Sequence, residues 1–346
     1  MMRVGIIGAG NIGRVHARAV LASADDGVSL AGLFDVDQGR AGALAAELGT
    51  RAFASLGELH GATDGIVVAS PNRTHAAYAG EALAHGRHVL CEKPMATSLA
   101  ETAEMLRLSS GATGVSCVGF NYRYLPAVRE IRRRIEEEEI GRVLHVAVAL
   151  RRSSAVTRAR FTWRDGPAER STSGALGDLG VHLVDMLHFL FRSPVDTGSC
   201  RVGLQTRVAT KEGHEVMVDD HAFVSGGLTD GPHFTLTASK SSAPDELGLA
   251  VTVTGSRGDL SYHSRDGQIL LVRTGVDVEP VKLLGPARLP DPPGEVTGWG
   301  DSFLEQLQEW AGAASGTRPE VLAGFGDGHL AQRVLEDLLR RGERLG

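Results

Sequence analysis

The stretch that decides the fold is residues 3–13, which read RVGIIGAGNIG. A short β-rich run ends at the first of three spaced glycines, and the helical spacing of apolar residues begins directly after them. Gly8 permits a tight turn, Gly10 lets a phosphate group approach the backbone, and Gly13 lets the helix pack closely on the strand. The spacing therefore predicts a strand–turn–helix unit whose first helical N–H groups face an anionic ligand.

The carboxylate of Asp35, after the next predicted strand, indicates which dinucleotide binds. Asp35 follows Gly13 by 22 positions (35 − 13) and comes directly after the apolar run VSLAGLF. A carboxylate at that place accepts hydrogen bonds from ribose hydroxyls and repels a 2′-phosphate. The pattern predicts NAD as the cofactor, with NADP disfavoured, and it places Asn11 and Ile12 beside the cofactor in the glycine loop.

The two halves of the chain differ in their hydrophobic pattern. Over residues 1–120 apolar strands alternate with helices, which predicts an α/β, NAD-binding Rossmann domain with a doubly wound parallel sheet. In residues 121–346, runs such as HFTLTASK and LAVTVTG alternate and are joined by short turns. They predict an α+β domain with a large open, mostly antiparallel sheet, and we expect this domain to bind the substrate. The sequence leaves open whether the C-terminal helices stay with this domain or pack back on the first domain.

Polar residues follow two further strands of the predicted parallel sheet, in SPNRTH (70–75) and EKP (92–94). Ligands of such sheets bind outside the carboxyl ends of the strands. The cofactor-binding prediction therefore extends to Ser70, Pro71, Asn72, His75, Glu92 and Lys93. Asn72 either caps the next helix or contacts the cofactor, and Glu92 has the alternative role of neutralising its neighbour Lys93.

One apolar helix carries an unusual polar stripe. In SGALGDLGVHLVDMLHFLF, which begins at Ser173, Asp178 and His182 are four positions apart on one helix face, and Asp185 continues the stripe. Three roles are open for these side chains. Asp178 could orient a core histidine, the three could bind a metal, or Asp178 and His182 could be catalytic. No Cys or His spacing supports the metal, so none is predicted.

The predicted cofactor and this helix together suggest hydride transfer. Oxidation of a secondary alcohol requires that the hydroxyl proton leaves with the hydride, and histidine is the side chain suited to take it near neutral pH. The Lys93 ammonium near the same oxygen would stabilise the developing alkoxide. Asp178 would hold either the His182 imidazole or the substrate hydroxyl.

An ordered set of motifs adds to this interpretation. GAGNIG, FDVD, SPNRTH, CEKP, GFNYRY and GDLGVHLVD occur in the order found in the glucose–fructose oxidoreductase/inositol dehydrogenase (Gfo/Idh/MocA) family, which the chain resembles over almost its whole length. The resemblance implies that Lys93, Asp178 and His182 are catalytic, with His182 as general base. It also implies that the protein is a homodimer or homotetramer packed through the open sheet of residues 121–346, which would then serve for oligomerisation. Ser173 and Gly174 depart from the paired glycines usual at that place.

The predicted reaction is the reversible, NAD-dependent oxidation of a secondary alcohol of a sugar, an aminosugar (also within an aminoglycoside) or a cyclitol. The alternatives are redox-neutral glycoside cleavage, ketosugar reduction in a biosynthetic pathway, and a non-catalytic sugar-binding regulator. Carboxylates at Asp178, Asp185 and Asp219 or Asp220 would suit an aminosugar. Arg123 either binds an anionic substrate group or makes an internal ion pair. The substrate-binding prediction comprises Lys93, Asn121, Arg123, Trp163, Asp178 and His182, with Tyr122 and Arg164 as further candidates.

Bulk composition excludes several other classes of protein. The chain of 346 residues has a formal net charge of −6 and no basic stripe, so we expect no nucleic-acid partner. Its three cysteines form no CxxC pair, which indicates a reducing compartment. The N-terminal apolar run is too short for a signal peptide, and no run approaches the roughly 20 residues that span a bilayer. We therefore expect a cytoplasmic protein with no membrane partner.

Overall fold

The computed structural model describes residues 1–167, 172–266, 269–274, 276–283 and 287–344. The chain divides into two compact units. The first unit comprises Met1–Tyr124, Ala287–Pro290 and Trp299–Gln332, and the second comprises Leu125–Pro286, Asp291–Gly298 and Arg333–Gly346. Within the described residues, no helix has both the length and the apolar content needed to cross a membrane.

The first unit is built on a parallel sheet of five strands in the order β2-β1-β3-β4-β5. The strands are short and apolar: β1 Met2–Ile7, β2 Val28–Phe34, β3 Gly65–Val68, β4 His88–Cys91 and β5 Ser116–Val118. The order reverses beside β1, which creates the switch point where ligands bind in such sheets. The predicted doubly wound Rossmann sheet is confirmed.

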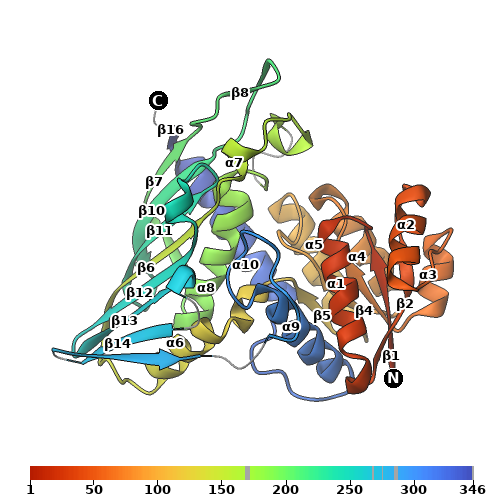
Figure 1. Cartoon of the computed structure of the whole chain (residues 1–346), viewed down its shortest axis with the longest axis horizontal. Coiled ribbons are helices and arrows are strands. Elements are labelled where there is room, and N and C mark those ends of the chain that lie inside the picture. The colour runs from red at the N-terminus through yellow and green to blue at the C-terminus, as the bar shows by residue number, and fades with distance from the viewer. Residues whose placement is uncertain (168–171, 267–268, 275, 284–286, 345–346) are drawn as a thin grey trace. The chain divides into compact units, whose positions relative to one another are not determined.

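Helices connect these strands, as Figure 1 shows in red and orange. They are α1 Asn11–Ala22, α2 Gln38–Leu48, α3 Leu56–Ala62, α4 His75–Ala84 and α5 Leu99–Gly111, with 3-10 turns at Ala24–Asp26, Asn72–Thr74 and Asn121–Tyr124. The side chains of Asp37, Ser55 and Ser98 cap α2, α3 and α5. Between α2 and α3, a single isolated bridge pairs Ala52 with Leu33 of β2.

A C-terminal helix completes the core of the first unit. Helix α9, Trp299–Ala314, packs against α1 and against the 3-10 turn Asn121–Tyr124. Its Trp310 is fully buried, and its Gln306 donates a hydrogen bond to the Val118 carbonyl at the end of β5. Helix α10, Phe325–Arg341, begins in the first unit and ends in the second.

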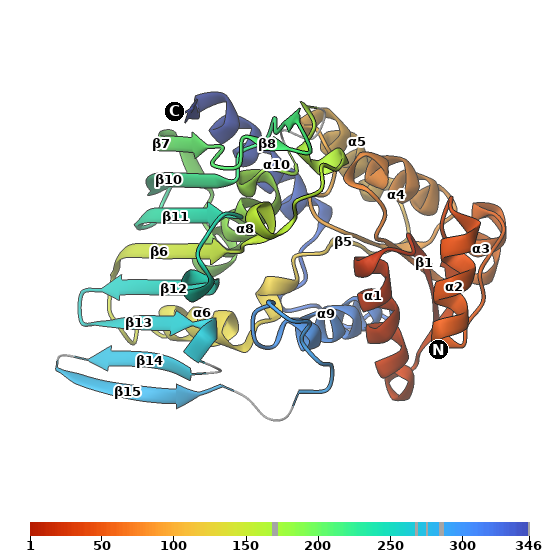
Figure 2. The ribbon, with the colours of Figure 1, turned by 45° about the horizontal axis from the view of Figure 1, so that its top comes forward.

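The second unit contains a nine-stranded sheet in the order β15-β14-β13-β12-β6-β11-β10-β7-β16. Its pairs are antiparallel except β11 with β6 and β16 with β7, which confirms a large and mostly antiparallel sheet. Figure 2 shows its strands side by side. Their bounds are β6 Val143–Arg151, β7 Val195–Gln205, β10 His221–Leu228, β11 His233–Ser239, β12 Gly248–Gly255, β13 Gly258–His263, β14 Ile269–Thr274, β15 Asp277–Lys282 and β16 Glu343–Arg344.

One face of this sheet is covered by helices and the other carries exposed apolar side chains. Helix α8, Val181–Phe191, contacts β6 and β7, and α6, Pro126–Glu136, packs on α8. Along β10, Ala222 and Val224 are buried, whereas Phe223 between them is 44% exposed.

The remaining elements are α7 Ser154–Thr157, the hairpin β8 Thr210–Lys211 and β9 His214–Glu215, 3-10 turns Trp163–Asp165, Pro244–Glu246 and Ser264–Asp266, and a π-helical turn Leu176–Gly180.

Candidate functional site

The glycine loop of the first unit has the geometry that the binding of a pyrophosphate requires. Gly8 has φ +108°, and a Cβ at Gly8 would lie 2.5 Å from the Ala69 carbonyl oxygen. A Cβ at Gly13 would lie 1.9 Å from the Gly8 carbonyl oxygen, so only glycine permits this contact between α1 and β1. At Gly10, by contrast, a Cβ would meet nothing within 4 Å, and no side chain caps the start of α1. The open space and the uncapped N–H groups fit a dinucleotide phosphate.

Asp35 ties the glycine loop to the end of β2. Its Oδ2 accepts a hydrogen bond of 2.8 Å from the Ala9 N–H, and its Oδ1 accepts one of 2.9 Å from the Asp37 N–H. The carboxylate is 8% exposed, and Arg40 Nη1 lies 3.8 Å from Oδ2. The carboxylate is therefore held in a fixed position at the end of the strand, where an adenosine ribose fits.

We expect Asp35→Ser to shift cofactor preference from NAD toward NADP by about tenfold or more, because it removes a negative charge and leaves Arg40 to face a 2′-phosphate. Serine retains an oxygen for the Ala9 N–H. Fluorescence titrations with NADH and NADPH measure the two dissociation constants without any substrate. The exposed variant Asp25→Ser is the control, and an unchanged ratio of constants in Asp35→Ser would contradict the role.

The SPNRTH segment is organised by a histidine rather than by an asparagine cap. Helix α4 and the 3-10 turn before it have no side-chain cap, so the capping role considered for Asn72 is not found. His75 is buried, with Nε2 2.9 Å from the Ser70 carbonyl oxygen and Nδ1 2.9 Å from the Pro94 carbonyl oxygen. Burial lowers the pKa of His75, and its ring links the two segments that were predicted to line the cofactor site.

Glu92 and His16 form a buried pair directly behind Lys93. Glu92 Oε1 lies 2.7 Å from His16 Nε2, and Glu92 Oε2 accepts a hydrogen bond of 3.1 Å from the Lys93 N–H. Burial by itself raises the pKa of the Glu92 carboxyl, but the hydrogen bond to His16 and the charges of His16 and Lys93 outweigh it and lower that pKa. Glu92 therefore does more than neutralise its neighbour, since it anchors the backbone of Lys93 to α1.

The lowered pKa of Glu92 makes a prediction about stability and pH. A carboxyl group whose pKa is lower in the folded than in the unfolded protein stabilises the fold at pH values above its unfolded pKa of about 4.3. This stabilisation is lost as the pH falls through the pKa of the folded protein. Glu92→Gln should therefore lower the free energy of unfolding by about 1–3 kcal/mol near pH 7. The deficit should shrink in acid, which thermal unfolding between about pH 2.5 and 7 measures, because this range extends below the unfolded pKa of about 4.3. The exposed variant Glu279→Gln is the control, and a deficit independent of pH would refute the role.

The GFNYRY segment (residues 119–124) contains three of the substrate-binding candidates. Two of their side chains form hydrogen bonds to other residues of the first unit. The amide nitrogen of Asn121 donates to Ser302 Oγ at 2.8 Å. Arg123 Nη2 donates to Asp327 Oδ1 at 3.0 Å, and its Nη1 donates to the Val321 carbonyl at 3.3 Å. Asn121, Tyr122 and Arg123 are all buried. Of the two roles predicted for Arg123, an anion-binding group or a member of an internal ion pair, the structure contains the ion pair, with Asp327.

In the second unit, Asp178 lies in the π-helical turn and His182 in the first turn of α8. The spacing was predicted to be helical, and it is, but the π turn was not foreseen. Such turns are frequent at functional sites. The His182 residue is 6% exposed, and the Asp178 side chain is 34% exposed. A carboxylate and an imidazole therefore project from consecutive turns of one helical segment.

The π turn is anchored by a neighbouring carboxylate, Asp219. Its Oδ2 accepts a hydrogen bond of 2.9 Å from the Leu176 N–H, and its backbone carbonyl accepts one of 2.8 Å from the Ala175 N–H. A Cβ at Gly174 would lie 1.9 Å from Asp219 Oδ1, so this second glycine is required although its partner position holds Ser173. Burial raises the pKa of Asp219.

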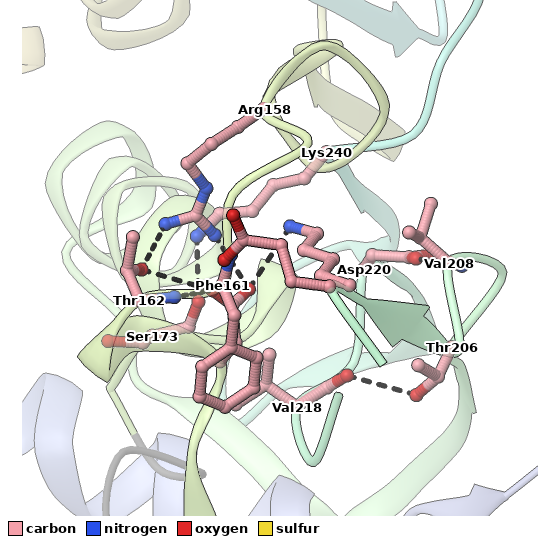
Figure 3. A network of polar contacts seen from close by, with 12 residues as sticks. Arg158, Phe161, Thr162, Ser173, Thr206, Val208, Val218, Asp220 and Lys240 are labelled. Carbon is pink, nitrogen blue, oxygen red and sulfur yellow. Dashed lines mark hydrogen bonds and ion pairs between the residues drawn. The ribbon is translucent and has the colours of Figure 1, made fainter. Parts of the chain in front are cut away.

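Lys240, which the sequence did not single out, contacts the predicted catalytic carboxylate. Its Nζ lies 2.6 Å from Asp178 Oδ2 and donates a hydrogen bond of 2.7 Å to the Ser173 carbonyl. Figure 3 shows the Lys240 side chain extending towards Ser173. The only signal in the sequence was a lysine directly after the alternating run HFTLTAS, and alternation alone does not reveal its partner.

The turn that carries Trp163 is fixed by the buried carboxylate of Asp165. This carboxylate accepts from Arg158 at 2.7 Å, from Lys211 at 3.1 Å and from the Thr162 N–H at 2.8 Å, and Figure 3 includes Arg158 and Thr162. Burial raises the pKa of Asp165, but these bonds outweigh it and lower that pKa. Trp163 itself is 36% exposed, and the Arg164 guanidinium stacks 4.2 Å from its ring centroid.

Comparison with known proteins places the chain in a family. Residues 2–120 match the model of the NAD-binding Rossmann fold of the Gfo/Idh/MocA oxidoreductase family, and residues 132–341 match the model of its C-terminal alpha/beta domain. The predicted NAD cofactor is thereby confirmed, and so is the predicted class of enzyme, an oxidoreductase acting on CH–OH groups of sugars.

Individual relatives are similar over almost their whole length. Glucose-6-phosphate 3-dehydrogenase of Bacillus subtilis (strain 168) is 38% identical over 97% of this chain and 95% of its own. Inositol 2-dehydrogenase 2 of Paenarthrobacter aurescens (strain TC1) is 29% identical over 98% and 95%. A crystal structure of an oxidoreductase domain protein from Kribbella flavida has a TM-score of 0.87 at 27% identity and covers 99% of this chain and 97% of that one. The chain belongs to the Gfo/Idh/MocA family of NAD-dependent sugar and cyclitol dehydrogenases.

Proposed function

We propose that this protein oxidises one secondary hydroxyl group of a pyranose sugar to a ketone, reversibly. The observation that carries the proposal is the pair formed by Asp178 in the π turn and His182 one turn later in α8. NAD⁺ supplies the hydride acceptor when it is bound. His182 takes the hydroxyl proton as general base, Asp178 orients the hydroxyl or the imidazole, and Lys93 stabilises negative charge on the reacting oxygen.

For the substrate we propose a neutral or anionic sugar, and glucose 6-phosphate with oxidation at C3 is the first candidate. The relative with 38% identity is named for that reaction. Three of the four carboxylates that suggested an aminosugar are engaged with the chain itself: Asp178 with Lys240, Asp219 with the Leu176 N–H, and Asp220 with two backbone N–H groups. An ammonium on the substrate would have to compete with Lys240 for Asp178 and would be repelled by it.

The test is an NADH absorbance assay with NAD⁺ and a panel of sugars. The panel contains glucose 6-phosphate, glucose, myo-inositol, levoglucosan, UDP-N-acetylglucosamine and an aminoglycoside. We expect NADH formation with a neutral or phosphorylated sugar, and loss of the signal in Lys93→Ala. Absence of NADH with every sugar, while NAD still binds, would reject the oxidation. The same panel run with keto sugars and NADH would then test the ketone reductase.

We also propose that the exposed face of the nine-stranded sheet joins copies of the chain into a homodimer or homotetramer. Phe223 on β10 and Leu271 on β14 are 44% and 42% exposed, and the register of the strands between them puts both side chains on the same face. Apolar side chains of this size on one open face are typical of a surface that is buried in an oligomer. Light scattering of the wild type and of Phe223→Glu tests this proposal, and a wild-type monomer would reject it.

A further inference from the structure

We propose that Lys240 is a positioning residue for this reaction: it clamps the π-helical turn and holds the Asp178 carboxylate in one orientation as an anionic acceptor. The inference rests on the proposed function, because it assigns a role to the partner of a proposed catalytic group. Lys240, which directly follows β11 of the second unit, would then be a second lysine with a role in the reaction, beside Lys93.

The contacts of the Lys240 ammonium support a clamp. Nζ lies 2.6 Å from Asp178 Oδ2 and 2.7 Å from the Ser173 carbonyl oxygen. Ser173 precedes the helical segment and Asp178 lies inside its π turn, so one ammonium joins the π turn to the residues just before it. An ammonium group donates only, and both of these partners accept, which makes the two contacts compatible.

The base of the Lys240 side chain is itself immobilised. The Lys240 N–H donates to the Asp220 carbonyl at 2.7 Å, and the Lys240 carbonyl accepts from the Ala155 N–H at 2.7 Å. Lys240 directly follows β11, and its side chain is only 12% exposed. A lysine on a flexible segment would lose much side-chain entropy on binding Asp178. Here the backbone bonds and burial have already removed part of that freedom.

The charges around Asp178 explain why the clamp is needed. Asp219, one of the residues that anchor the π turn, is a second carboxylate close to Lys240, and its own neighbour Asp220 raises its pKa further after burial. His182 follows one turn after Asp178. Removal of the Lys240 ammonium would take away the positive charge that lies 2.6 Å from Asp178 Oδ2, and protonation of the Asp178 carboxyl would be favoured. A protonated Asp178 would carry an O–H donor in place of one acceptor oxygen, and it would be a weaker hydrogen-bond acceptor for the substrate hydroxyl.

The experiment compares Lys240→Met, Lys240→Arg and Lys282→Met in the full-length protein. The chain has four lysines, and Lys282 is the exposed one on edge strand β15, so Lys282→Met is a matched control. With NAD⁺ and glucose 6-phosphate, or whichever sugar of the panel reacts, Lys240→Met should lower kcat about 10-fold to 100-fold. KM should change by less than about threefold, because the effect falls on the transition state.

The pH profile distinguishes positioning from a merely structural role. In Lys240→Met the acid limb of kcat/KM should move to higher pH, since loss of the positive charge favours protonation of Asp178. Lys240→Arg should restore part of kcat and return the limb towards its wild-type position. Wild-type kcat together with an unmoved acid limb in Lys240→Met would overturn the proposal.

A double-mutant cycle in thermal unfolding separates failure of this inference from failure of the proposed function. Lys240→Met, Asp178→Asn and the double variant are compared without any substrate. Non-additive changes in the free energy of unfolding support the clamp even if no sugar is oxidised. Additive changes would overturn it, whatever the sugar panel shows.

Discussion

Replacing His182 with asparagine should lower kcat by a factor of about 10²–10⁴, the usual contribution of a general base. Asparagine is similar in size and retains hydrogen-bonding groups, but it cannot accept a proton at neutral pH. The side chain lies at the start of α8 and follows the π turn that carries Asp178. The loss should therefore appear in the chemical step, and NAD affinity, which depends on the glycine loop, should not change.

Steady-state kinetics with NADH absorbance measure this loss, and fluorescence titration with NADH measures the cofactor affinity. His233→Asn is the matched control, because His233 is an exposed histidine on β11 of the same unit. It should retain wild-type kcat. A His182→Asn variant with kcat within about twofold of the wild type would remove His182 from the proposed mechanism. The structural role of a core histidine would then be the remaining explanation.

Alanine at Gly13 and alanine at Gly10 should have opposite effects on folding and on cofactor binding. A Cβ at Gly13 would lie 1.9 Å from the Gly8 carbonyl oxygen, a backbone atom that cannot move away without displacing β1. We expect Gly13→Ala to destabilise the fold by about 1–3 kcal/mol or more, as overpacking does. A Cβ at Gly10 meets nothing within 4 Å, so Gly10→Ala should fold like the wild type and yet lose NAD binding, because the Cβ occupies the space of the pyrophosphate.

Thermal unfolding and NADH titration of the two variants test this prediction. Gly42→Ala, an exposed glycine inside α2 whose Cβ would also meet nothing, is the control. It should bind NADH normally and stabilise the fold by about 0.5–1 kcal/mol, because alanine favours the helix. Gly10→Ala with wild-type NADH affinity would contradict the placement of the pyrophosphate at the glycine loop.

The sequence predicted the fold class and the order of most elements because these depend on local patterns. Hydrophobic period and glycine spacing distinguish the parallel sheet of the first unit from the antiparallel strands of the second. Asp35 and the Asp178–His182 pair were found in the same way, through short offsets along one element or its neighbour. The π turn was missed because Leu176–Gly180 has ordinary helical spacing, and only its backbone hydrogen bonds distinguish it.

For some candidate residues, the fold decides the hydrogen-bonding partner or the lack of a capping role, and the sequence could not predict either. Arg123 was left between an anionic substrate and an internal ion pair, and the fold supplies Asp327, which is 204 positions away along the chain. Asn72 has the residue type of a helix cap, but the chain enters α4 through Thr74 without a side-chain cap. Residue type sets what a side chain can do, whereas the approach of another segment sets what it does.

The sequence by itself determined the cradle for the dinucleotide, the carboxylate at Asp35 and the helical spacing of Asp178 and His182, since each follows from steric and hydrogen-bonding rules within a few residues. Only the tertiary structure decided that Glu92 pairs with His16, 76 positions away, and that Lys240 pairs with Asp178, 62 positions away (240 − 178). Each of these contacts joins a helical segment to the residue that directly follows a strand. They form only when the helical segment packs beside that strand end, and no local pattern specifies which charged side chains then meet.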